Sequence, residues 1–152
     1  MRKLRSLLRR ALRVLLRSVV LDIVNSEIRI WGDPQRLNIA PTAYMVNTLF
    51  NVSSGTIHIG DFTFTGHNVS IITGTHDYDV FLAERQRSIP RSGRDIHIGK
   101  GVWIGSNALI LGPCTIGDHA VIAAGALVVT DVASGAVVAG VPARLIRSLE
   151  MA

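Results

Sequence analysis

The sequence is short of cysteine and of aromatic residues. Its 152 residues include one cysteine, Cys114, which excludes an intrachain disulfide and favours a reducing compartment such as the cytoplasm. Aromatic residues make up 5% of the chain and apolar residues 48%, so the core must be built from aliphatic side chains. With only 18% charged residues, the composition excludes a disordered chain, and the length predicts one folded domain.

Acidic residues are missing from residues 1–20, which carry seven arginines and lysines. Without these seven, the formal charge of +5 becomes −2, so the basic character belongs to one segment and no nucleic-acid partner is expected. Leucines in this segment follow the i, i+3, i+4, i+7 spacing of an amphipathic helix, which we expect over residues 1–21. Its longest uncharged run, Ser18–Leu21, is too short to span a membrane, and the segment lacks the apolar stretch of a secretory signal.

Three interpretations of this basic helix stay open. It can dock its leucines on its own domain or on a sister subunit, as most amphipathic helices do. It can lie on a membrane surface, which would make a cytoplasmic protein peripheral to the inner face of the membrane through residues 1–20. It also has the composition of an organelle transit peptide.

A six-residue repeat dominates the second half of the chain. Aliphatic residues recur in a fixed frame at Ile98, Ile104, Ile110, Ile116, Ile122 and Val128. The fifth residue of each hexapeptide is small or β-branched, and the pattern recurs from Ile59 to Ile71 and more weakly at Ile39. A period of six fits neither a helix nor a hairpin sheet, so we predict a three-sided solenoid with one short strand per hexapeptide. The first and fifth residues would point into a narrow interior.

The frame breaks once, between Ile71 and Ile98. The interruption predicts a loop that leaves the solenoid near residues 77–95, a polar stretch with four arginines, one proline and one glycine. A long excursion from a regular scaffold is more often functional than idle.

These motifs resemble those of the hexapeptide-repeat acyltransferases, especially the galactoside, maltose and polysaccharide O-acetyltransferases. The similarity is carried by residues 59–77, 96–129 and the AGVPAR turn at 139–144. It implies an all-β fold, a left-handed parallel β-helix. We expect this β-helix domain over residues 22–143, after the basic helix of residues 1–21 and before a short helical tail over residues 144–152.

The resemblance also implies a catalytic residue. His76 ends the last hexapeptide before the extruded loop, and the family's general base stands at the matching point. A histidine can accept a proton from a hydroxyl near neutral pH, although a solvated surface histidine would look the same in the sequence. Asp77 and Asp79 follow directly and could orient the ring or contact the acceptor.

A metal site is the rival interpretation of the histidines. His58 and His76 are 18 residues apart, one full turn, so they could stack, and His97 could join them after the loop. The closely spaced histidine pair of zinc-binding β-helix proteins is absent, so we expect no metal. Cys114 occupies a fifth position and is expected to be a buried structural residue rather than a nucleophile.

The family likeness further implies acetyl-CoA as cosubstrate, held in a groove between subunits of a homotrimer. The matching positions are Trp103, Ser106, Ala124, Arg144 and Arg147, and Thr130, also expected to contact the cofactor, stands where the family often has lysine. Trp103 is a sixth residue and must face outward, towards a ligand or another subunit. The two arginines suit the phosphates of CoA, because guanidinium groups donate two hydrogen bonds in one plane.

The acceptor is less well defined. The sugar-binding residues of the galactoside enzymes do not align, and we expect Asn51, Asp77 and Arg85 to contact the substrate. The predicted activity is O-acetylation of a sugar hydroxyl in a polysaccharide or glycolipid precursor. Acylation of an amino sugar is the alternative, and a non-enzymatic β-helix scaffold is the third hypothesis.

Overall fold

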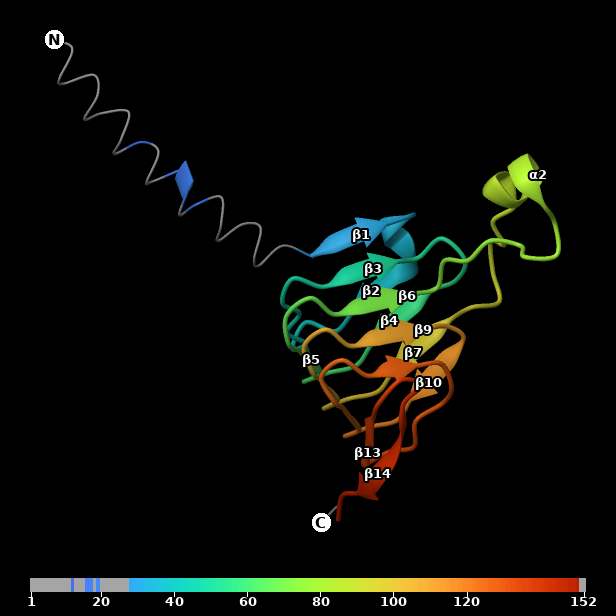
Figure 1. The fold of residues 1–152 in the computed structure, drawn as a ribbon. Coiled ribbons are helices and arrows are strands. Elements are labelled where there is room, and N and C mark those ends of the chain that lie inside the picture. Colours follow the sequence, from blue (N-terminus) through green and yellow to red (C-terminus); the bar gives the residue numbers. More distant parts are fainter. Residues whose placement is uncertain (1–11, 13–15, 18, 20–27, 151–152) are drawn as a thin grey trace, which may run out of the picture.

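The computed structural model describes residues 12, 16, 17, 19 and 28–150 (Figure 1). Residues 12, 16, 17 and 19 are helical and exposed, and the rest of the amphipathic helix predicted over residues 1–21 lies outside the described residues. Among the described residues, no helix combines the length and the apolar character needed to cross a membrane.

The body of the protein is a three-sided parallel β-helix, as predicted. Successive strands pass from one side to the next, and strands of successive turns pair to form three sheets. Sheet A consists of β1 (Arg29–Trp31), β3 (Leu49–Asn51), β6 (Ser70–Ile72), β9 (Leu109–Leu111) and β12 (Leu127–Val128). Sheet B consists of β2 (Leu37–Ile39), β4 (Ile57–Ile59), β7 (Ile96–Ile98) and β10 (Cys114–Ile116), and a short 3₁₀ turn, η1 (Pro34–Arg36), precedes it. Sheet C consists of β5 (Phe64–Thr65), β8 (Trp103–Ile104), β11 (Val121–Ile122), β13 (Ala136–Ala139) and β14 (Arg144–Ser148).

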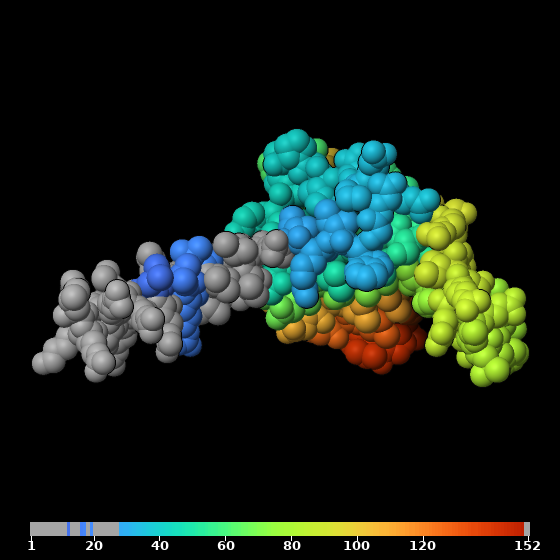
Figure 2. Space-filling view, turned by 90° about the horizontal axis from the view of Figure 1, so that it is seen from above, coloured from blue at the N-terminus to red at the C-terminus, as the bar shows by residue number. Residues whose placement is uncertain are grey.

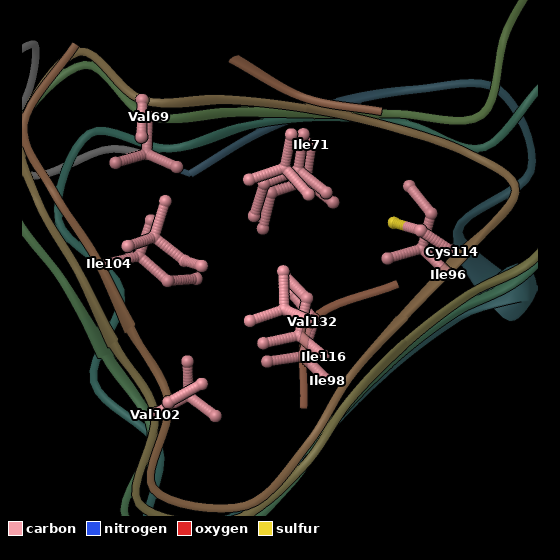
Figure 3. Close-up of a cluster of buried hydrophobic side chains, with 14 of the residues drawn as sticks. Val69, Ile71, Ile96, Ile98, Val102, Ile104, Cys114, Ile116 and Val132 are labelled. Atoms are coloured by element: carbon pink, nitrogen blue, oxygen red, sulfur yellow. The ribbon is translucent and has the colours of Figure 1, made fainter. Parts of the chain in front are cut away.

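Aliphatic side chains fill the triangular interior (Figure 3). The first-position residues Ile104, Ile110 and Ile122 are fully buried, and the small fifth-position residues Ala108 and Ala120 are buried beside the corners. Each fully buried isoleucine contributes about 1.5–3 kcal/mol through its removal from water. The hexapeptide frame and the inward direction of its first and fifth positions are therefore confirmed.

Asparagine and glycine make the corners. At the corner between sheets C and A, hereafter the C/A corner, Asn47, Asn68 and Asn107 have φ values of 42°, 57° and 59°, and Gly125 has 69°. Asparagine and glycine are the residues that adopt this left-handed conformation at least cost. The Nδ2 of Asn47 also donates to Oδ1 of Asn68 at 2.8 Å, which ties two successive turns together.

The predicted loop leaves the coil at the corner between sheets A and B, hereafter the A/B corner. Ile57 pairs with Ile96, 39 residues later, whereas Ile96 pairs with Cys114 after one regular turn of 18. The extra residues form an arm that projects from the coil (Figure 2). The arm carries a short helix, α2 (Leu82–Arg87), which the sequence did not predict (Figure 1).

The predicted helix over residues 144–152 is wrong. Residues Arg144–Ser148 form β14, which pairs antiparallel with β13 after a turn that includes Gly140 at a φ of 95°. The last parallel strand of sheet C leaves an open edge, and the reversed chain fills it with backbone hydrogen bonds. Pairing with the open edge of β13 therefore overrides the helical propensity of a segment rich in arginine and leucine.

Candidate functional site

His76 lies at the A/B corner where the loop leaves the coil, and its side chain is exposed. Its Nδ1 lies 2.8 Å from the main-chain oxygen of Arg85 in α2. Because a carbonyl oxygen can only accept, Nδ1 must carry the hydrogen. The neutral ring therefore keeps Nε2 as a free acceptor, which is the state that a general base needs.

The guanidinium of Arg85 holds the loop in the shape that this contact requires. Its Nε donates to the carbonyl of Val80 at 2.7 Å, and its Nη2 donates to the carbonyl of Tyr78 at 3.0 Å. The same group lies over the ring of Phe81, 5.0 Å from the centroid. Arg85 thus binds His76 through its backbone and the start of the loop through its side chain.

The other two residues predicted to contact the acceptor substrate are Asp77 and Asn51, and both lie near the point where the loop leaves the coil. Asp77 follows His76, but its Oδ1 accepts from the backbone N–H of Asp79 at 2.9 Å, so a carbonyl rather than a carboxylate holds the imidazole. Asn51, one turn earlier, packs against Gly74, where an added Cβ would meet its Oδ1.

Ser106 and Ala124 stack on successive turns at the C/A corner. The N–H of Gly125 donates to the carbonyl of Ser106 at 2.9 Å, and Gly105 packs closely against the backbone of Ala124. Two other predicted residues lie at the C-terminal end of the coil. Thr130 and Arg144 line one hollow of about 260 Å³ there.

Trp103 faces outward from sheet C, as its sixth position predicts, and is 49% exposed. Its ring stacks on that of Phe64 at a centroid distance of 6.1 Å, and Phe64 is bridged to Tyr44 in the preceding turn. In the other direction the same outward row passes through two valines and reaches Arg147 on β14. This row forms an exposed stripe along the coil axis, with aromatic rings at one end and arginine at the other.

Within one chain, the predicted catalytic and cofactor residues are not brought together. His76 stands at the A/B corner and Ser106 at the C/A corner, at opposite edges of sheet A. In a single chain, the predicted catalytic residue and the predicted cofactor residues therefore lie on different corners.

The predicted stacking of His58 on His76 is wrong. His58 stacks instead on His97, because the inserted loop makes β7 rather than the residues around His76 the neighbour of β4. Over residues 28–150 and the four described residues before them, no three histidine, cysteine, aspartate or glutamate side chains are grouped so that they could hold a metal ion.

Two features of the site escaped the sequence analysis. The carbonyl of Arg85 carries no sequence signal, because any residue at that point of the loop offers the same atom. The aromatic row was detectable, since Tyr44, Phe64 and Trp103 each occupy the sixth position of a hexapeptide that starts with isoleucine.

Comparison with known proteins shows which proteins share this three-sided coil of hexapeptides. The family model described as bacterial transferase hexapeptide (six repeats) matches residues 95–129. Galactoside O-acetyltransferase from Escherichia coli K12 is 34% identical over 113 residues, which cover 61% of this chain and 54% of that enzyme. The chain therefore contains the hexapeptide repeat of this family model and is similar to hexapeptide-repeat acetyltransferases.

Solved structures agree with this assignment. A maltose O-acetyltransferase from Clostridium difficile 630 matches with a TM-score of 0.57 and 28% identity, over 82% of this chain and 68% of that one. A galactoside acetyltransferase in complex with coenzyme A matches with a TM-score of 0.56 and 31% identity, over 80% and 65%. The chain spans about half the length of the curated relatives it matches.

Proposed function

We propose that this protein is an acetyl-CoA-dependent O-acetyltransferase that acts on a sugar hydroxyl, in a polysaccharide or glycolipid precursor, and works as a homotrimer of left-handed β-helices. The observation that carries the proposal is the bond between Nδ1 of His76 and the carbonyl of Arg85, which leaves Nε2 free as a base. The names of the related acetyltransferases support the reaction, and the galactoside and maltose enzymes among them support a sugar acceptor.

His76 would act as the general base. Its Nε2 accepts the proton of the acceptor hydroxyl while the oxygen attacks the thioester carbonyl carbon, and the proton then passes to the departing CoA thiolate. Proton transfer by a positioned side chain contributes about 10²–10⁴-fold to such a rate. The acetyl group passes directly to the acceptor without a covalent acyl-enzyme, so the reaction requires no nucleophile from the protein.

The residues at the C/A corner and on sheet C suit coenzyme A. The small, exposed Ala124 lets an extended ligand approach the backbone closely, and Ser106 lies on the next turn towards the N-terminus. Arg144 and Arg147 on β14 offer planar donors to phosphate at the far end of this stripe. Successive turns are about 4.8 Å apart, so residues along the stripe can contact successive parts of an extended ligand that lies parallel to the coil axis.

The outer face of sheet A supports the trimer. Its outward side chains are mostly apolar, namely Leu49, Ile72, Leu109, Leu111 and Leu127, and all are half-buried already in one chain. The outward row of sheet B is polar, namely Asn38, His58, His97 and Thr115. A ring of three chains with sheet A facing the centre would bury the apolar face and leave the polar one in water.

This arrangement would also complete the site. Threefold symmetry around sheet A places the C/A corner of one chain beside the A/B corner of the next. Ser106 and Ala124 of one chain would then lie next to His76 and the loop of its neighbour. Tyr44 and Phe64 extend the stripe beyond Trp103, and their exposed rings suit the apolar face of a sugar in the acceptor.

The reaction is tested by incubating the protein with acetyl-CoA and a panel of sugars and amino sugars. Free thiol release measures transfer, and treatment of the product with hydroxylamine separates an ester, which is cleaved, from an amide, which is not. Ester products support the proposal. Amide products alone would favour the amino-sugar alternative, and no product with any acceptor would favour a scaffold.

Mixed trimers test the shared site. The variants His76→Ala and Ala124→Trp each inactivate one half-site, and we expect both homotrimers to be inactive. Random mixing of the two chains restores about a quarter of the sites, because each site takes one half from each of two chains. Heterotrimers that form but stay inactive would contradict a site between subunits.

A further inference from the structure

A stacked pair of histidines stands on sheet B, a different side of the coil from the proposed trimer contact on sheet A. His58 of β4 and His97 of β7 occupy the same register on adjacent turns, and both side chains are exposed. Their rings are nearly parallel, at 4°, with centroids 5.0 Å apart. Thr115 continues the row on the next turn. The pair lines a shallow groove of about 450 Å³ on sheet B.

A fixed carboxylate lies beside this pair. Asp95 stands two residues before His97, and its Oδ1 accepts from the backbone N–H of Thr56 at 2.6 Å and from the Thr56 hydroxyl at 2.8 Å. A carboxylate that two hydrogen bonds hold in place therefore lies two residues from His97, at the start of β7.

We propose that His58 and His97 form a chelating pair for a divalent first-row transition metal, separate from the active site. Neutral imidazole is the commonest protein ligand for Zn²⁺, Ni²⁺ and Cu²⁺. Both rings come from a rigid sheet that holds them side by side, and the negative charge of Asp95 favours a cation over an anion at this place.

The geometry requires only a small change. Tetrahedral coordination with bonds of about 2.0–2.1 Å places two ligand nitrogens about 3.3 Å apart, so two rings at 5.0 Å must tilt towards each other. Both side chains are exposed, so rotation about their side-chain bonds can provide this tilt without moving the strands. No third protein ligand joins them within the described part of the chain, so water would fill the remaining coordination positions. The bound metal would therefore exchange with metal ions in solution.

A metal bound by His58 and His97 would stabilise the fold, because the two histidines lie on different turns of the coil. His58 lies in the turn before the extruded loop and His97 in the turn after it. A metal bound by both would link the two turns from which the loop of His76 departs. Because such a ligand binds the folded state and not the unfolded chain, it would raise the thermal midpoint as its concentration rises.

Metal titration of the full chain tests the proposal. In chelator-treated buffer, calorimetry with NiCl₂ or ZnCl₂ should show one site per chain, and the thermal midpoint should rise with the metal. His58→Gln and His97→Gln should each weaken binding about tenfold or more, since each removes one of two ligands. Glutamine keeps the size and polarity of these exposed positions, and circular dichroism verifies that each variant is folded.

The control is His67→Gln, an exposed histidine near the C/A corner that should bind and respond like wild type. His76→Gln should also keep the metal site, because His76 stands apart from the pair. MgCl₂ should have no effect, since Mg²⁺ prefers oxygen ligands. Equal binding by wild type and His58→Gln, or equal loss in His67→Gln, would overturn the proposal.

Discussion

Nδ1 of His76 lies 2.8 Å from the main-chain oxygen of Arg85, so a backbone carbonyl from the extruded loop holds the imidazole. This contact joins a residue at a rigid corner of the coil to one on a projecting arm. The arm is shaped in turn by the guanidinium of Arg85, which binds the carbonyls of Tyr78 and Val80. The loop therefore holds the imidazole of His76 in place, and a change in the loop should lower the rate of acetyl transfer.

Replacement of Arg85 should test this unit. Arg85→Gln removes the bonds to Val80 and Tyr78 and the contact with Phe81, so the ring of His76 loses its fixed orientation. We expect kcat to fall about 10- to 100-fold, with the thermal midpoint and the KM for acetyl-CoA little changed. Arg85→Lys should not restore kcat, because an ammonium cannot donate as the guanidinium fork does.

The matched control for Arg85 is Arg87→Gln in the same short helix, which should keep wild-type kinetics. If Arg85→Gln instead raises the KM for the acceptor at unchanged kcat, Arg85 binds substrate, as the sequence analysis predicted. Wild-type kinetics in Arg85→Gln would contradict both roles.

A charge on the outer face of sheet A should break the assembly. Leu109→Glu places a carboxylate in the proposed apolar contact, where burial of an unpaired charge is costly. We expect monomers by light scattering and loss of transfer activity. Thr115→Glu, on the outer face of sheet B, should remain a trimer, and a trimeric Leu109→Glu would locate the interface elsewhere.

The corners should tolerate no added carbon where two turns touch. At Gly60, an added Cβ would lie 2.6 Å from the backbone of Gly99, so Gly60→Ala forces the two turns apart. We expect a loss of about 2–3 kcal/mol in the free energy of unfolding, measured by urea denaturation. Gly93→Ala meets nothing within 4 Å and should lose about 1 kcal/mol through its positive φ alone. Equal losses would remove the close contact as the cause.

The thiol of Cys114 should be unreactive in the folded protein. Cys114 is 4% exposed in the interior, and burial raises its pKa to about 11, so little thiolate exists near neutral pH. Titration with a disulfide reagent at about pH 8 should modify it only after unfolding in urea. Rapid modification of the native protein would show that this part of the interior opens.

The hexapeptide frame predicted the fold because it repeats one physical requirement. Each first position, such as Ile104, must fill a narrow interior, and each fifth position, such as Ala108, must fit beside a corner. The same frame predicted the outward direction of Trp103 and the point at which the loop leaves the coil. These features are local and periodic, so one sequence contains enough information to find them.

The errors arose where long-range pairing decides the structure. The strand β14 forms because β13 has an open edge, and the sequence of residues 144–152 gives no sign of that edge. The partner of His58 is His97 and not His76, because the inserted loop changes which turn is the neighbour. Similarly, the carbonyl of Arg85 reaches His76 through the fold of the loop and not through the identity of a residue.

Acetyl transfer by His76→Gln is the most direct test of the central claim. With acetyl-CoA and the best sugar acceptor, the variant should lose about 10²–10⁴-fold in kcat, while His67→Gln keeps the wild-type rate. The KM for acetyl-CoA and the thermal midpoint should stay near wild type, because the His76 ring is exposed and its hydrogen bond is to a loop carbonyl rather than to the interior. A His76→Gln protein that transfers acetyl groups at the wild-type rate would contradict the account.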